Sequence, residues 1–292
     1  MVSDSIGRTM GDERRPNEAV PLGEASVVAD IDFLSGSRHR LRILEVLRER
    51  EAVSRRDVRT SVEASRATVR RTLEEFLRRG WVESTNDGYR ITAAGELVAA
   101  SFARLSGTLR LTEEFAPLLE HVPPSSFDIE PEWLADAELT VSTAAEPYAP
   151  AQTQTETIRT ADRFRGFLPA IELDGTKLVH DRITSGEFTA SIVLGPVCAD
   201  RIKGEPFAEL FRDKLATDRF EASLADSPLP FYFGLPDDDG IEIGVADDEG
   251  IPRALLRSSN ADFREWGEEV FERLKRDAER LSVADFEPET HS

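Results

Sequence analysis

Along the first third of the chain, hydrophobic residues recur every three or four positions, which is the spacing of amphipathic helices. Residues 37–50 form one such segment, a second begins after Ser54, and a third begins after Ser65 and ends at Gly80. A serine stands at the start of each segment, where its hydroxyl can accept a hydrogen bond from a free backbone N–H of the first helical turn. We therefore expect three short helices, each with one buried face.

The pattern then changes to two short runs that are typical of strands, residues 81–83 and 89–92. The pair Asp87 and Gly88 between them suits a tight hairpin turn. A long helix is predicted over residues 93–121, and its apolar stripe is wide enough to join two domains or to form part of a dimer seam. The order of helix, helix, turn, helix, hairpin and helix is typical of a winged helix-turn-helix.

Beyond residue 122, strand-like and helical segments alternate, which is typical of an α/β domain. The predicted strands are residues 139–143, 164–171, 188–194, 220–225, 231–235, 241–245 and 252–256. The predicted helices lie near residues 150–161, 176–185, 207–216 and 261–281.

We therefore predict a mixed fold, α+β or α/β, with an N-terminal winged helix-turn-helix, a long linker helix and a C-terminal α/β effector domain. The predicted boundaries are a disordered tail at 1–26, the winged helix at 27–92, the linker or dimerisation helix at 93–122, the effector or assembly domain at 123–282, and a tail at 283–292.

The charge of the chain is unevenly distributed. The net charge is -20, which at first argues against binding to nucleic acid. Residues 1–30 carry -3, residues 31–110 carry +5, and residues 111–292 carry -22. The predicted winged helix is thus a basic island in an acidic protein, and a local excess of positive charge is what a DNA-binding surface requires.

Composition also indicates the environment in which the protein works. Of the 36 basic residues only four are lysine, and this acidic, lysine-poor composition is typical of proteins dissolved in molar salt. No apolar run approaches the roughly 20 residues needed to cross a bilayer, and no signal peptide is apparent. The lone Cys198 excludes an intrachain disulfide. We expect a cytoplasmic protein of a halophilic organism.

The third predicted helix carries the candidate DNA-reading side chains. Such a helix enters the major groove led by its N-terminal residues, and arginine can bond guanine O6 and N7 in a bidentate manner. The start of the second helix favours phosphate, and the hairpin can reach the backbone or the minor groove. The expected DNA-binding residues are Arg55, Arg56, Ser65, Arg66, Thr68, Arg70, Arg71, Asn86 and Arg90. The alternative is that each arginine-rich face is only a solvated surface.

The chain resembles haloarchaeal winged-helix regulators of the ArsR-like superfamily in five stretches: 33–37 (FLSGS), 40–44 (RLRIL), 65–73 (SRATVRRTL), 79–82 (RGWV) and 89–95 (YRITAAG). The C-terminal part resembles the effector domain of the filament and methanogenesis regulator of methanogens in stretches 133–141 (WLADAELTV), 147–150 (PYAP), 164–169 (FRGFLP) and 229–232 (LPFY). The resemblance implies a regulator with a sensing or assembly domain, and it implies no catalytic residues and no cofactor.

Other candidate sites are weaker. Thr143 and Tyr148 lie between a predicted strand and helix, a place where α/β sheets bind ligands, although a tight turn with a packed tyrosine is the favoured explanation. The four histidines form no zinc motif, and His180 lacks the lysine partner of a phosphodiesterase site. The acidic runs 237–240 and 247–250 fit hairpin turns better than cation sites. We expect no enzyme and no bound metal.

The leading hypothesis is a homodimeric, sequence-specific transcriptional regulator. Its partners would be a double-stranded DNA operator, a second copy of the chain and a small-molecule effector, with no membrane. One alternative is a DNA-binding or protein-assembly module that senses nothing. A less favoured alternative is a nucleic-acid-processing enzyme with a winged-helix appendage, because no paired nucleophile and base are apparent.

Overall fold

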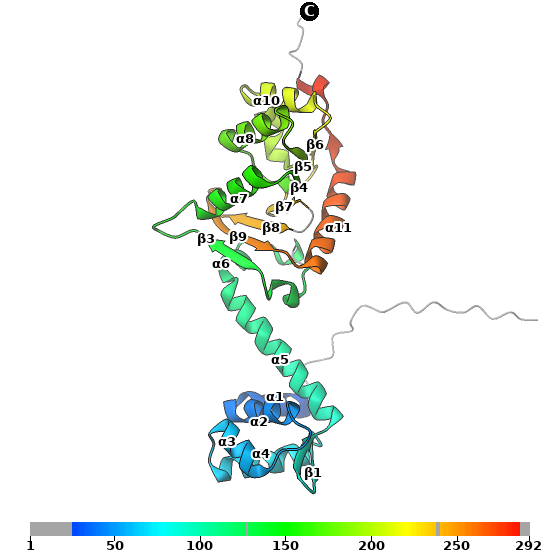
Figure 1. Cartoon of the computed structure of the whole chain (residues 1–292). Coiled ribbons are helices and arrows are strands. Elements are labelled where there is room, and N and C mark those ends of the chain that lie inside the picture. The colour runs from blue at the N-terminus through cyan, green and yellow to red at the C-terminus, as the bar shows by residue number, and fades with distance from the viewer. Residues whose placement is uncertain (1–24, 127, 238–239, 287–292) are drawn as a thin grey trace, which may run out of the picture. The chain divides into compact units, whose positions relative to one another are not determined.

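The computed structural model describes residues 25–126, 128–237 and 240–286. The chain divides into two compact units between Leu105 and Ser106. Unit 1 is mainly helical, and unit 2 contains an eight-stranded sheet, which confirms the predicted mixed fold class (Figure 1). None of the helices described has the length and apolar content needed to cross a membrane.

Unit 1 has the predicted order of three helices, a hairpin and a helix, preceded by one further helix. Its elements are α1 (Ala25–Ser35), α2 (Arg38–Arg48), α3 (Arg55–Val62), α4 (Arg66–Arg78), β1 (Val82–Thr85), β2 (Gly88–Ile91) and the first part of α5 (Ala93–Glu114). The predicted tail at 1–26 needs correction, because Ala25 and Ser26 belong to α1, while residues 1–24 lie outside the described residues. The core of unit 1 includes Ile43, Leu44, Leu47, Val58, Val69, Leu73 and Phe76.

Two of the three predicted serine caps form. The Ser54 hydroxyl accepts a hydrogen bond from the backbone N–H of Asp57 and donates to its carboxylate, and the Ser65 hydroxyl accepts from the N–H of Thr68 at 3.1 Å. Ser37 precedes α2 but makes no side-chain cap. Such a cap stabilises a helix by about 1 kcal/mol, so the starts of α3 and α4 are locally defined.

The predicted helix over residues 93–121 is interrupted, which corrects that prediction. α5 ends at Glu114, Phe115 leaves the helical conformation, and α6 (Ala116–Leu119) follows. The cause is Pro117, which lacks an N–H and whose ring clashes with the carbonyl of the residue four positions earlier. Phe115 is only 1% exposed and packs in the core of unit 2.

The sheet of unit 2 has the strand order β10-β6-β5-β4-β7-β8-β9-β3. The strands are β3 (Glu138–Val141), β4 (Arg163–Leu168), β5 (Thr189–Leu194), β6 (Phe220–Leu224), β7 (Tyr232–Pro236), β8 (Ile241–Ala246), β9 (Pro252–Ser258) and β10 (Glu279–Arg280). β4, β5 and β6 are parallel, and the remaining pairs are antiparallel. Parallel neighbours need crossover connections, and helices provide them here.

Helices cover both faces of this sheet (Figure 1). The main ones are α7 (Ala149–Thr160), α8 (Leu173–Thr184), α10 (Phe207–Leu215) and α11 (Ala261–Asp277). The shorter ones are η1 (Pro124–Ser126), η2 (Pro131–Leu134), η3 (Pro196–Cys198), α9 (Ala199–Lys203) and η4 (Val283–Phe286). Alternate residues of β4 point to opposite faces, so Phe164 packs with α8 and α10 while Phe167 packs with α11.

The predicted C-terminal tail also needs correction. Residues 283–286 form η4, and Phe286 stacks on Phe211 with ring centroids 5.7 Å apart. Phe286 is 6% exposed, so it belongs to the core on the α8 and α10 face. Residues 287–292 of the predicted tail lie outside the described residues. Because Phe286 packs in this core, the folded unit extends beyond the predicted boundary at residue 282.

The same core contains a lysine. Lys214 of α10 is 2% exposed, and its Nζ lies 4.0 Å from the ring centroid of Phe211 and 4.5 Å from that of Phe220. The ring faces attract the cation, but they replace only part of its lost hydration. Burial lowers the pKa of Lys214 to about 7.

Replacing Lys214 with methionine should increase the free energy of unfolding at neutral pH and flatten its pH dependence. Between the folded pKa of about 7 and the ordinary value of 10.5, the unfolded chain binds more protons than the folded one. Wild-type stability should therefore rise with pH in this window, by up to about 1.4 kcal/mol per pH unit. Chemical denaturation of both proteins across this window checks the prediction, and parallel pH profiles would contradict it.

Candidate nucleic-acid interface

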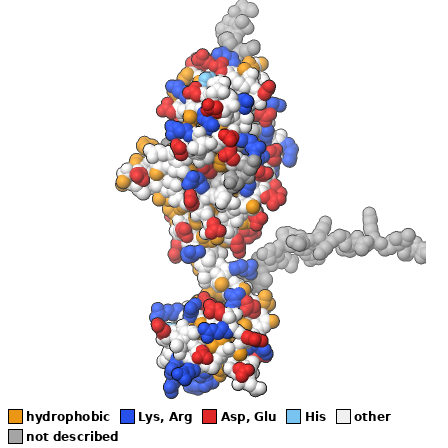
Figure 2. Space-filling model, in the orientation of Figure 1, with side chains coloured by type: hydrophobic (Ala, Val, Ile, Leu, Met, Phe, Trp, Pro, Cys, Tyr) orange, Lys and Arg blue, Asp and Glu red, His pale blue; other side chains and the backbone are white. Residues whose placement is uncertain are grey.

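α4 has one buried and one basic face. Val69, Thr72, Leu73 and Phe76 are buried against unit 1. The opposite face exposes the side chains of Arg66, Ala67, Arg70 and Arg71. Basic side chains gather over the lower left edge of unit 1 in Figure 2, beside α3 and α4. Burial of the apolar stripe therefore determines which way the arginines point.

The expected DNA-binding arginines differ in how firmly the protein holds them. Within the described residues, Arg56, Arg66 and Arg71 make no ion pair, and all three are exposed. Arg70 pairs with Glu74 on the next turn at 3.1 Å, with both side chains more than half exposed. Because an exposed pair of this kind contributes less than about 1 kcal/mol, Arg70 can exchange its partner for another anion.

Ser65 and Thr68 begin α4 and bond to one another. The Ser65 hydroxyl, which caps the helix, lies 2.9 Å from the Thr68 hydroxyl. These two hydroxyls therefore hold the first turn of α4 in place, next to Arg66. Their expected contact with DNA stays a prediction.

The hairpin lies next to the start of α3. Arg55 donates to the Tyr89 hydroxyl at 2.5 Å, and its guanidinium lies 5.7 Å from the Tyr89 ring centroid. Arg90 pairs with Glu83 directly across the hairpin at 2.6 Å, and Asn86 is exposed in the turn. The role of Tyr89 could not be predicted from the sequence, because nothing in the hairpin pattern indicates a tyrosine that reaches the start of a helix.

Arg79 is structural. Its guanidinium is bonded to Asp30 of α1 at 2.8 Å, contacts Glu75, and lies 3.9 Å from the ring centroid of Phe33. Its side chain is only 11% exposed. These contacts attach α1 to the end of α4, so α1 is part of the folded unit.

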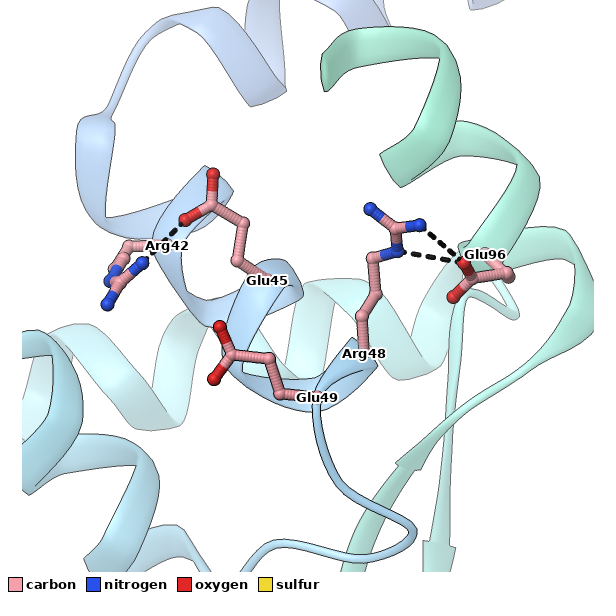
Figure 3. A pocket seen from close by; sticks show the side chains of 5 residues that line it. All are labelled: Arg42, Glu45, Arg48, Glu49 and Glu96. Atoms are coloured by element: carbon pink, nitrogen blue, oxygen red, sulfur yellow. Dashed lines mark hydrogen bonds and ion pairs between the residues drawn. The ribbon is translucent and has the colours of Figure 1, made fainter. Parts of the chain in front are cut away.

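A hollow of about 430 Å³ lies between α2 and the start of α5 (Figure 3). Arg48 points to Glu96 and bonds its carboxylate at 2.7 Å, whereas Arg42 pairs with Glu45 on its own helix at 3.0 Å. The bond to Glu96 raises the pKa of Arg48. Both arginines are already paired with carboxylates, so this hollow offers little positive charge to a ligand. The ion pair between Arg48 and Glu96 joins α2 to α5.

The two residues expected to bind a ligand lie in the turn before α7. The Thr143 hydroxyl accepts from the N–H of Glu146 at 3.0 Å, and Tyr148 is 59% exposed at the helix start. The two hollows described in unit 2 are lined by other residues. A ligand at Thr143 and Tyr148 therefore stays a prediction.

The run 247–250 and the described residue Asp237 lie in turns, as expected. Asp247 accepts from the N–H groups of Glu249 and Ile251, and Asp237 accepts from those of Asp162 and Arg163. Asp238 and Asp239 lie outside the described residues. Across the described ranges, no three histidine, cysteine or acidic side chains converge as a metal site would require.

Cys198 is buried, and His180 lies between two acidic side chains. Cys198 is 1% exposed, and burial raises the pKa of its thiol, which fits the expected small buried hydrophobe. His180 lies between Asp181 at 3.0 Å and Asp213 at 3.5 Å.

Several solved structures are distantly similar to this chain. TrmBL2, described as an archaeal chromatin protein, is 12% identical over 86% of this chain and 98% of that chain, with a TM-score of 0.40. Nuc, a phospholipase D family member from Salmonella typhimurium, is 13% identical over 50% of this chain and 99% of that chain, also with a TM-score of 0.40. No curated protein sequence matches the chain.

Two protein families match it directly, in separate stretches. Residues 28–114 match the family described as the HVO_A0261 N-terminal domain. Residues 147–277 match the family described as the middle domain of the methanogenesis regulatory protein FilR1. The first stretch contains α4 and the hairpin. The second contains the helices α7 to α11 and six of the eight strands of the unit 2 sheet, all except β3 and β10 at its edges. The matches therefore support a regulatory protein whose N-terminal part is similar to the first family and whose C-terminal part is similar to the second.

Proposed function

We propose that this protein is a sequence-specific DNA-binding transcriptional regulator of a halophilic archaeon, that it acts as a homodimer, and that it has no catalytic role. Unit 1 is its winged helix-turn-helix, and unit 2 is its sensing or assembly domain. The observation that carries the proposal is the exposed, weakly held arginine face of the capped helix α4. The similarity of unit 2 to the middle domain of a regulatory protein supports the same function.

In the proposed complex, α4 enters the major groove with its N-terminal turn foremost. Arg66, Arg70 and Arg71 are long enough to reach base edges, and each can bond guanine in a bidentate manner. Arg56 lies in the first turn of α3, where free N–H groups and the helix dipole favour a phosphate. Asn86 and Arg90 of the hairpin contact the DNA backbone next to the groove that α4 enters.

Charge limits how the protein can bind. Residues 111–292 carry a net charge of -22, which opposes approach to DNA, and high salt weakens phosphate contacts steeply. The basic excess of residues 31–110 is only +5. Binding must therefore depend on direct base contacts and on two copies that share one operator, more than on diffuse positive charge.

Unit 1 exposes apolar side chains that a second copy can cover. Leu97 and Leu105 of α5 are 72% and 49% exposed, and Val27, Val28 and Ile31 of α1 are each about 41% exposed. On an otherwise highly charged surface these residues are the best candidates for a dimer seam. A dimer would present two α4 helices to two half-sites.

The Arg70→Ala/Arg71→Ala double variant should lose at least tenfold in affinity for its operator, since each bidentate base contact contributes about 1–3 kcal/mol of discrimination. Footprinting on the promoter region of the protein's own gene, over a range of salt concentrations, measures this loss. Arg159→Ala is a matched control, because Arg159 is a similarly exposed arginine in unit 2. Wild-type binding by the double variant at every salt concentration would show that α4 is not the recognition helix.

Arg56→Ala should weaken binding to operator and unrelated DNA by the same factor. The proposed contact is to phosphate, so its removal should also make the slope of log affinity against log salt shallower by about 1. Gel shifts on both DNAs across a salt series provide the measurement. A loss confined to the operator would instead assign Arg56 to base reading.

Leu97→Asp/Leu105→Asp should convert the dimer to a monomer, because burying two carboxylates in an apolar seam is costly. Sedimentation at micromolar concentration in high salt measures the oligomeric state. Val197→Asp is the control, because Val197 is 74% exposed in unit 2. A monomeric wild type, or a double variant that remains dimeric, would refute this seam.

A further inference from the structure

Unit 2 contains a polar hollow of about 370 Å³ beside α7, β8, β9 and the start of β3. Thr157 and Thr160 of α7 form one wall. Glu242 of β8 and Arg257 of β9 line it from the sheet, and Ser258 and Ser259 lie at the end of β9. This volume is in the range of small-molecule sites.

Glu242 is the unusual group in this hollow. It is 2% exposed, and its two carboxylate oxygens accept from the Thr157 hydroxyl at 2.5 Å and from the Tyr232 hydroxyl at 3.1 Å. In the described part of the chain, no basic side chain lies within ion-pair distance of Glu242. Burial raises its pKa, against the opposing effects of the two hydroxyls and of the nearby Arg257 charge. Arg257 lies directly across from Glu242 on β9, but its ion pair is with Glu138. A buried carboxylate that no cation contacts directly is costly.

Arg257, the basic residue that lines the hollow, is already engaged. It pairs with Glu138 at 2.7 Å, while its Nε is buried without a partner. Asp136 and Asp237 contribute further negative charge to the walls. The hollow therefore has an excess of negative charge, which repels an anionic ligand and attracts a cationic one.

The wall that contains Asp237 is firmly held. Arg264 of α11 is 6% exposed and donates to the carbonyl of Pro236 at 2.9 Å, to that of Asp237 at 2.8 Å, and to that of Gly240. These bonds hold the backbone at residues 236, 237 and 240, next to Glu242. This described part of the wall is thus held in place, as a preformed site requires.

We infer that this hollow binds a small organic cation, with an ammonium or guanidinium group bonded to Glu242. The cation would provide the direct ion-pair partner that Glu242 lacks, and the hydroxyls of Thr160, Ser258 and Ser259 can bond its remaining polar groups. A neutral polyol would leave the Glu242 carboxylate uncompensated. The inference rests on the sensing role proposed for unit 2, and it assigns that role to the hollow at Glu242.

Agmatine tests the inference, because it has an ammonium group at one end and a guanidinium group at the other. Isothermal titration of the full chain with agmatine, in the salt in which the protein is folded, should show saturable binding at one site per chain. Glycerol and butyrate, the neutral and anionic controls, should not bind. Absence of saturable agmatine binding, or equal binding of either control, overturns the inference.

Glu242→Gln should weaken agmatine binding at least tenfold, while Glu156→Gln, which alters an exposed acid of α7, should leave it unchanged. Thr160 is exposed, so a phenylalanine there should fill the hollow without disturbing the core, and Thr160→Phe should abolish agmatine binding. This variant still tests the site if Glu242→Gln fails to fold. Wild-type affinity in both Glu242→Gln and Thr160→Phe overturns the site. Gel shifts on the same samples separate the two proposals: agmatine binding without DNA binding contradicts only the proposed function, and DNA binding without agmatine binding contradicts only this inference.

Discussion

The arrangement of unit 1 depends on one short backbone pairing. Val53, just before α3, exchanges two hydrogen bonds with Tyr89 of the hairpin, at 2.9 and 3.0 Å. The approach is so close that a Cβ on Gly88 would lie 2.4 Å from the Val53 carbonyl oxygen, and Gly88 has a φ of 140° that side chains rarely adopt. Val53 is itself in the core of unit 1. Because this pairing joins the hairpin to the start of α3, the arginines of α3, α4 and the hairpin can belong to one surface.

Arginine has two separate uses in this protein. Arg79 and Arg264 are largely buried and bond to carboxylates or carbonyls, so they join α1 to α4 and α11 to the turn after β7. Arg66 and Arg71 are exposed, with no ion pair among the described residues. Arginine suits both uses because its planar group holds several bonds when buried and remains charged when exposed. Composition alone does not distinguish buried structural arginines from exposed ones. The burial of the helix face on which each arginine lies does distinguish them.

Much of the fold could be predicted from hydrophobic spacing. The predicted strands and long helices of unit 2 lie within a few residues of their positions in the structure, because each has one face buried against the sheet or a helix. α1 was missed because Val27, Val28 and Ile31 are exposed rather than part of a buried stripe. The break at Phe115 depends on Pro117, whose effect the apolar stripe concealed. The hollow at Glu242 could not be predicted, because its walls are brought together from α7, β8 and β9.

The two edges of the sheet have a consequence for how copies of the chain can meet. One edge strand, β10, is two residues long, and both of these, Glu279 and Arg280, are charged. The other, β3, has four residues and begins at Glu138. Short, charged edges are poor templates for adding a strand from another molecule, which protects an exposed sheet from aggregation. Self-association of this acidic protein should therefore occur through helix surfaces, with side chains in contact, and the eight-stranded sheet should stay closed to extension.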